Sequence, residues 1–82
     1  MNEQLIVFAM RGICSRLETA SHAADTVSGI HLVWINWAEP TPPQAITLQA
    51  LQRLEANGLV ERVAIQEGEL WKKSTIKPPS PT

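Results

Sequence analysis

The stretch from Thr41 to Ile76 constrains the fold of this chain most, because it predicts one helix leading directly into one β-hairpin. Thr41 and Gln44 have the spacing of a capping box, in which the Thr hydroxyl accepts from the Gln44 backbone N–H. Pro42 suits the first helical position, where its missing N–H is not needed. Gly58 suits the left-handed conformation that ends a helix.

The predicted helix over residues 42–57 has one apolar face. The residues on that face recur at spacings of three and four, as expected for a helix that packs on a core. They are Ile46, Thr47, Ala50, Leu51 and Leu54. The opposite face is polar or small and almost uncharged, so this face is available to a partner.

The hairpin is predicted from residues 59–66 and 70–76, with Glu67-Gly68 as a two-residue turn. Arg62 then lies beside the tryptophan of the second strand and opposite Lys73. The register pairs two residues of each strand: Ile65 with Leu70, and Ala64 with Trp71.

Residues 2–20 predict a further helix, with Asn2 as its N-cap. Its apolar face consists of Ile6, Met10, Ile13, Cys14 and Leu17. Val7 and Phe8 lie off that face. Phe8 is therefore expected either to pack under a neighbouring segment or to be an exposed contact.

The segment between the two helices is less regular. Ser21 is expected to cap a short helical turn through Val27, which Ser28-Gly29 then breaks. Residues 30–37 are β-branched and aromatic, which favours a strand. A helical alternative stays open because four apolar residues recur at spacings of three and four: Val27, Ile30, Trp34 and Trp37.

Composition excludes several classes of function. The chain has 82 residues, which suits one small domain, and its net charge of −1 is unlike that of a dedicated nucleic-acid binder. Cys14 is the only cysteine, so a cytoplasmic location is the expectation, and no apolar run is long enough to span a membrane. No phosphate loop and no metal-ligand spacing is present, and His31 is interpreted as a packing residue. We therefore expect no enzyme activity, no cofactor and no metal.

The run from Leu51 to Val63 resembles the helix-to-wing junction of the winged-helix superfamily. The resemblance implies an α+β fold: a small winged-helix-like domain with two or three helices packed on a C-terminal β-hairpin. The domain is expected to span residues 1–76, followed by a proline-rich flexible tail at residues 77–82.

The resemblance implies two functions. The first is a small DNA-binding transcriptional regulator, whose contacts to double-stranded DNA would come from Gln49, Gln52, Arg53, Arg62, Lys72 and Lys73. The alternative is a non-catalytic protein-interaction module or inhibitor that binds a protein partner through Leu48 and Trp71. Trp71 has a second interpretation, in which it closes the edge of the core under a cation–π contact with Arg62.

Surface charge separates the two functions. A basic patch near the predicted cations favours DNA, and a contiguous apolar patch that includes Leu48 or a tryptophan favours a protein partner. A homodimer formed through Val7 and Phe8 is a further alternative for the partner.

Overall fold

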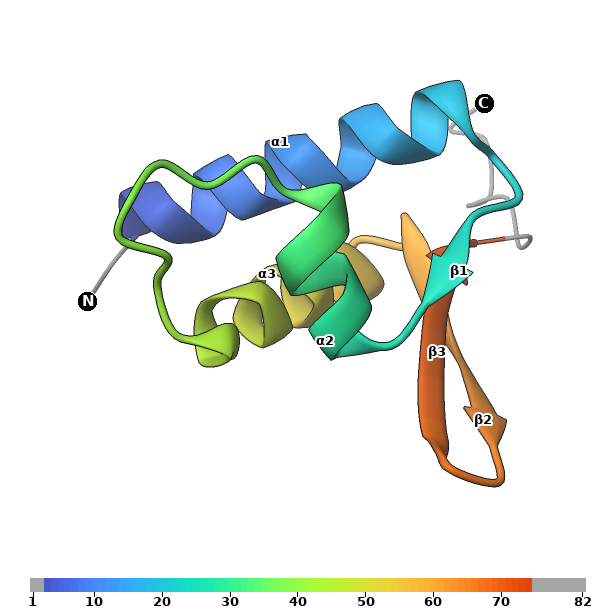
Figure 1. The fold of residues 1–82 in the computed structure, drawn as a ribbon. Helices are drawn as coiled ribbons and strands as arrows, with labels where there is room; N and C mark the ends of the chain where they lie inside the picture. The colour runs from blue at the N-terminus through green and yellow to red at the C-terminus, as the bar shows by residue number, and fades with distance from the viewer. Residues whose placement is uncertain (1–2, 75–82) are drawn as a thin grey trace, which may run out of the picture.

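The computed structural model describes residues 3–74 of the chain. Its helices are α1 (Glu3–Thr19), α2 (Val27–Gly29) continuing into the π-helical turn η1 (Ile30–Trp34), and α3 (Gln44–Ala56). Its strands are β1 (Ala24–Asp25), β2 (Val60–Ile65) and β3 (Gly68–Lys73). The fold is therefore α+β, with three helical segments before a C-terminal hairpin (Figure 1). The predictions for residues 75–76 and for the proline-rich tail lie outside the described residues.

Within residues 3–74 the strands form one antiparallel sheet in the order β1-β3-β2. The short strand β1 pairs with β3 through Ala24 opposite Lys72 and Asp25 opposite Trp71. The hairpin of β2 and β3 extends away from the helices, as Figure 1 shows. This order of elements and strands is compatible with winged-helix topology.

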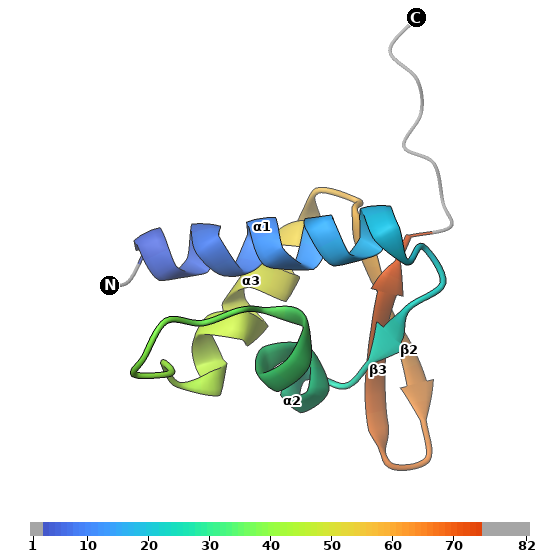
Figure 2. The same cartoon turned by 45° about the horizontal axis from the view of Figure 1, so that its top comes forward.

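The core lies between α1, α3 and the base of the hairpin. Both views show α1 alongside α3, with the sheet at one end of the helices (Figures 1 and 2). The buried apolar residues are Ile6, Ala9, Ile13, Leu17, Ile30, Trp34, Ile35, Ile46, Ala50, Leu51, Leu54, Val60 and Trp71. The predicted apolar face of the helix before the hairpin is confirmed, since all five of its residues are buried in α3.

The prediction of a short helix capped by Ser21 is wrong. The chain instead turns and adds β1 to the free edge of β3, which supplies the hydrogen bonds that β3 lacks on that side. The helix begins later, with Thr26 as its N-cap, and the Thr26 hydroxyl accepts from the Gly29 N–H at 3.2 Å. Gly29 does not break the helix; a Cβ there would lie 2.2 Å from the Asp25 carboxylate, so any other residue would displace that side chain.

The ambiguous segment at residues 30–37 is helical first and extended afterwards. Ile30–Trp34 form the π-helical turn η1, and Ile35 adopts an extended conformation with φ −107° and ψ 125°. Burial of Ile30 and Trp34 against the core overrides the β propensity of these residues. The side chain of Trp37 is only partly buried and packs against the rim of the core.

The capping box predicted for the third helix does not form. Pro43 is the N-cap, with ψ 149°, and no side chain caps the helix. A proline disfavours helical geometry in the residue before it, so Pro43 keeps Pro42 outside the helix. The helix therefore begins at Gln44 rather than at Pro42. At its other end Gly58 has φ +75°, as predicted.

The hairpin register differs from the prediction by two residues. Ile65 pairs with Gly68, so the loop is Gln66-Glu67, and Arg62 lies directly opposite Trp71. Gly68 has φ +142°, a conformation that only glycine adopts readily, and it begins β3 rather than ending the turn. Because the shift is two residues, every side chain stays on its predicted face of the sheet.

Candidate functional site

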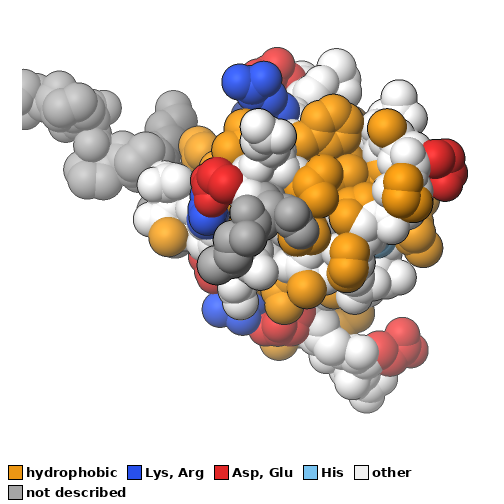
Figure 3. All heavy atoms as spheres, turned by 90° about the vertical axis from the view of Figure 1, so that its left-hand side faces the viewer, with side chains coloured by type: hydrophobic (Ala, Val, Ile, Leu, Met, Phe, Trp, Pro, Cys, Tyr) orange, Lys and Arg blue, Asp and Glu red, His pale blue; other side chains and the backbone are white. Residues whose placement is uncertain are grey.

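An exposed apolar surface lies where the first half of α1 meets the connection between η1 and α3. It surrounds a shallow hollow of about 250 Å³. We call it the apolar face and define it by Leu5, Phe8, Trp37, Ala38, Pro40 and Pro42. Figure 3, viewed from this side, shows hydrophobic side chains gathered together. The rings of Phe8 and Trp37 are 5.5 Å apart and tilted by 33°, a favourable aromatic geometry, although Phe8 remains 45% exposed.

His31 holds the apolar face in place from below. It is buried, and its Nε2 lies 2.9 Å from the Pro42 carbonyl while its Nδ1 lies 2.6 Å from the Thr47 hydroxyl. A carbonyl can only accept, so Nε2 donates to Pro42 and, in the neutral ring, Nδ1 accepts from Thr47. The Trp37 indole N–H donates to the His31 carbonyl at 2.9 Å. Thus one buried side chain and its backbone position both Trp37 and Pro42.

The interpretation of His31 as a satisfied packing residue is confirmed by these hydrogen bonds. The two interpretations of Phe8 combine, because its ring packs on Trp37 and also faces solvent. Sequence reasoning did not identify the apolar face itself. The available signal was the off-face Phe8, but nothing in the sequence indicated that Trp37 would lie against it.

Arg53, predicted to contact DNA bases, lies instead against the beginning of α1. Its guanidinium makes a two-pronged ion pair with Glu3, and one of the two hydrogen bonds measures 2.7 Å. The hydrogen bond from Arg53 lowers the pKa of Glu3, while the smaller effect of desolvation raises it. The pair joins α3 to α1 and neutralises the cation.

Two basic residues of the hairpin, Arg62 and Lys72, also face carboxylates. Arg62 Nε lies 2.8 Å from Glu55 Oε2, its guanidinium is 3.7 Å from Glu69, and it stacks over Trp71 at 5.2 Å from the ring centre. Lys72 Nζ is 3.9 Å from Glu61.

Trp71 is only 3% exposed. A side chain buried to this extent offers no surface for a partner, so the prediction that Trp71 is an exposed contact is wrong. The other interpretation, in which it closes the core edge beneath Arg62, agrees with the geometry.

The remaining predicted site residues are dispersed. Gln52 is exposed on α3, Gln49 is half-buried and Leu48 is 37% exposed. Lys73 lies at the base of the hairpin, beside the far end of α1. Since Arg53 points to α1 while Lys72 and Lys73 lie near β1, the described cations do not form one basic patch.

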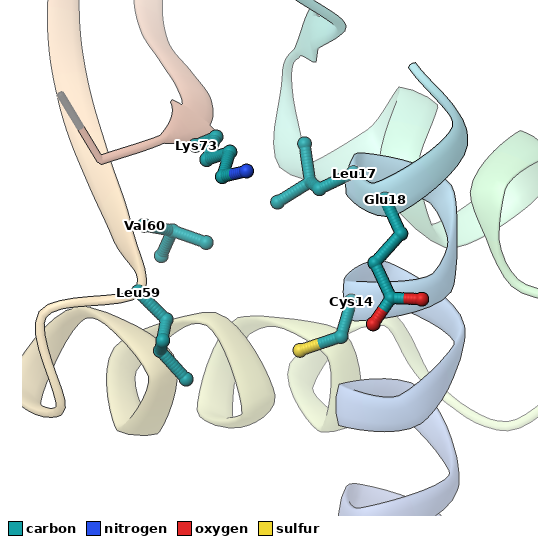
Figure 4. A pocket seen from close by; sticks show the side chains of 6 residues that line it. All are labelled: Cys14, Leu17, Glu18, Leu59, Val60 and Lys73. Atoms are coloured by element: carbon teal, nitrogen blue, oxygen red, sulfur yellow. The ribbon is translucent and has the colours of Figure 1, made fainter. Parts of the chain in front are cut away.

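A second hollow, of about 230 Å³, separates α1 from the base of the hairpin (Figure 4). Its lining consists of Cys14, Leu17 and Glu18 from α1, with Leu59, Val60 and Lys73 from the hairpin side. Burial, and to a lesser degree the charge of Glu18, raises the pKa of the Cys14 thiol. The thiol is therefore protonated at neutral pH, which is the poorly nucleophilic form.

Within residues 3–74 no helix has the length and apolar character needed to cross a membrane. The same residues contain no cluster of three or more His, Cys, Asp or Glu side chains placed to hold a metal ion. No protein-family model, no curated protein and no solved structure matches this chain.

Proposed function

We propose that this chain is a non-catalytic protein-interaction module of winged-helix type, which binds a partner protein through the apolar face. The observation that supports this most is the Phe8–Trp37 pair, exposed to solvent yet organised from below by His31. Large aromatic side chains held in one orientation are typical of the residues that contribute most to protein interfaces. Binding then costs little conformational entropy, because the face is already arranged.

The charge distribution supports a protein partner over a nucleic acid. Non-specific affinity for DNA comes mainly from cations that neutralise phosphates. Three of the predicted cations already have carboxylate partners, namely Arg53, Arg62 and Lys72. A phosphate would have to displace those carboxylates, and the net charge of −1 adds no long-range attraction.

A small DNA-binding transcriptional regulator is the second candidate function. The order of helices and strands favours it, since this topology is compatible with a winged helix whose α3 enters the major groove. Gln49 and Gln52 would then contact base edges, and Lys72 and Lys73 the phosphates.

Titration of labelled random duplex DNA at low and then higher salt separates the two functions. A protein-interaction module gives no retardation of any duplex at low salt. A DNA-binding regulator gives an affinity that falls with salt, and replacement of Lys72 and Lys73 by Ala lowers the slope of that dependence by up to about 2. Such a result would replace our proposal with the DNA function.

The protein-binding function is tested by crosslinking the purified chain in an extract and comparing Phe8→Asp with Ile65→Asp. The two side chains have similar exposure, 45% and 39%, but Ile65 lies on the hairpin next to its turn, away from the apolar face. We expect Phe8→Asp to lose the crosslinked product and Ile65→Asp to retain it. If both variants lost the crosslinked product, or if both retained it, the apolar face would have no specific role in binding.

A further inference from the structure

The exposed side of α1 continues the apolar face into a third shallow hollow, of about 330 Å³. Its lining residues are Glu3, Gln4, Val7, Phe8 and Arg11. Gln4 and Phe8 line both hollows, so the two surfaces are continuous. Along this side of α1, the acidic Glu3 lies at one end, the apolar Val7 and Phe8 lie in the middle, and the basic Arg11 lies at the other end.

The charges are placed symmetrically about Val7. Glu3 precedes Val7 by four residues and Arg11 follows it by four, so the three side chains share one side of the helix. At a rise of 1.5 Å per residue, each charge lies about 6 Å along the helix from Val7. A two-fold axis through Val7 would run two copies of α1 antiparallel and bring Arg11 of each copy opposite Glu3 of the other.

We propose that the partner of the apolar face is a second copy of this chain, docked antiparallel through α1 about a two-fold axis at Val7. This inference rests on the proposed function and names the partner for the same surface. The dimer contains two intermolecular ion pairs, one at each end of an apolar centre formed by the Val7 and Phe8 side chains. A surface that pairs with itself in this way is the usual arrangement in two-fold symmetric dimers.

The charge of Arg11 favours this partner. Arg11 is exposed and makes no ion pair with any residue from 3 to 74, although it borders an apolar surface. Glu3 already accepts from Arg53, but the two oxygens of a carboxylate can accept further hydrogen bonds. An axis at Arg11 itself would place like charges opposite each other, so the charge pattern selects the axis at Val7.

Two charge reversals provide the test. In Arg11→Glu two acidic side chains face each other at each end of the interface, and in Glu3→Arg two basic side chains do. Each variant alone is expected to stay monomeric at concentrations where the wild-type mass doubles, measured by sedimentation equilibrium. Lys73→Glu makes the same change of charge as Arg11→Glu but lies beside the opposite end of α1, near Leu17 and Glu18, so it should dimerise like the wild type.

An equimolar mixture of the two variants is expected to form a heterodimer. At one end of that interface the native pair of Glu3 with Arg11 remains. At the other end the arginine introduced in one chain meets the glutamate introduced in the other, so the pair is reversed but still attractive. A dimer that forms in the mixture but in neither variant by itself would therefore show that residues 3 and 11 pair across the interface in antiparallel fashion.

Circular dichroism and thermal unfolding establish that each variant folds. If Glu3→Arg does not fold without its pair to Arg53, Phe8→Asp and Arg11→Glu provide the test, and both should be monomeric. The inference is overturned if the wild type stays monomeric up to millimolar concentration, if Arg11→Glu dimerises normally, or if the mixture of folded variants stays monomeric. One result would overturn this inference and leave the proposed function standing. In that result the wild type is monomeric but crosslinks to a different protein, and Phe8→Asp abolishes that crosslink.

Discussion

The apolar face and the hairpin present opposite kinds of surface on one small core. On the hairpin, Arg62 and Lys72 lie next to carboxylates, so the charges largely cancel where they stand. On the apolar face, the rings of Phe8 and Trp37 pack on each other, and the Trp37 indole N–H donates to the His31 carbonyl beneath. The charges of Arg62 and Lys72 are thus paired within the chain, whereas on the apolar face two aromatic rings lie together with area that a partner would remove from water.

The difference shows why counting basic residues does not identify a DNA-binding surface. Arg53 and Arg62 carry the charge that phosphate contacts require, but each is directed to a carboxylate on another element. Placement of the opposing charge, rather than the number of cations, decides whether a surface attracts a polyanion.

The largest expected effect is on the core that both regions share. Leu54 is 1% exposed, so Leu54→Ala should lower the free energy of unfolding by about 2–5 kcal/mol. Urea unfolding followed by tryptophan fluorescence and by circular dichroism should show one common transition. Leu32→Ala, at a residue 68% exposed, is the control, with an expected change of about 0.5 kcal/mol or less. Separate transitions would mean that the two regions do not share one core.

A smaller effect is expected beneath the apolar face. His31→Ala leaves the buried Thr47 hydroxyl without its partner, which costs about 1–3 kcal/mol, while the partly buried Pro42 carbonyl can bind water instead. Denaturant unfolding measures the loss, and the exposed His22→Ala provides the control. If His31→Ala matched His22→Ala in stability, the apolar face would not depend on this hydrogen-bond network.

The smallest effect concerns the ion pair between Glu3 and Arg53. Because that pair holds the Glu3 pKa below its usual value of 4.5, it stabilises the fold above that value and the contribution is lost as the pH falls through the lowered pKa. Glu3→Gln should therefore lower the thermal midpoint slightly at neutral pH, and the difference from wild type should vanish in acid. Leu32→Ala, which changes an exposed side chain without a titratable group, is the control, and its difference from wild type should not depend on pH. A constant difference at all pH values would show that the side chain acts by packing instead.

Local signals in the sequence determined the order of the main elements. The periodic apolar residues of α1 and α3 were sufficient because a helix needs one buried stripe, and those stripes are present in the sequence. Gly58 marked the end of α3 because few other residues adopt its φ of +75°. The hairpin followed from two short β-forming runs with a turn between them, although the observed strand register differs from the predicted one by two residues.

Tertiary contacts decided everything that depends on residues distant in the sequence. β1 exists because β3 has an edge to pair with, and η1 is helical because Ile30 and Trp34 meet the core. The apolar face needed Phe8, Trp37 and Pro42 to converge. His31 places Trp37 and Pro42 through two hydrogen bonds that no local pattern encodes, and Phe8 then packs on Trp37. The pairing of Arg53 with Glu3 spans fifty residues of chain. Periodicity identifies the apolar side of a helix or strand, but only tertiary packing determines which other element contacts that side. The candidate site depends on those contacts between elements.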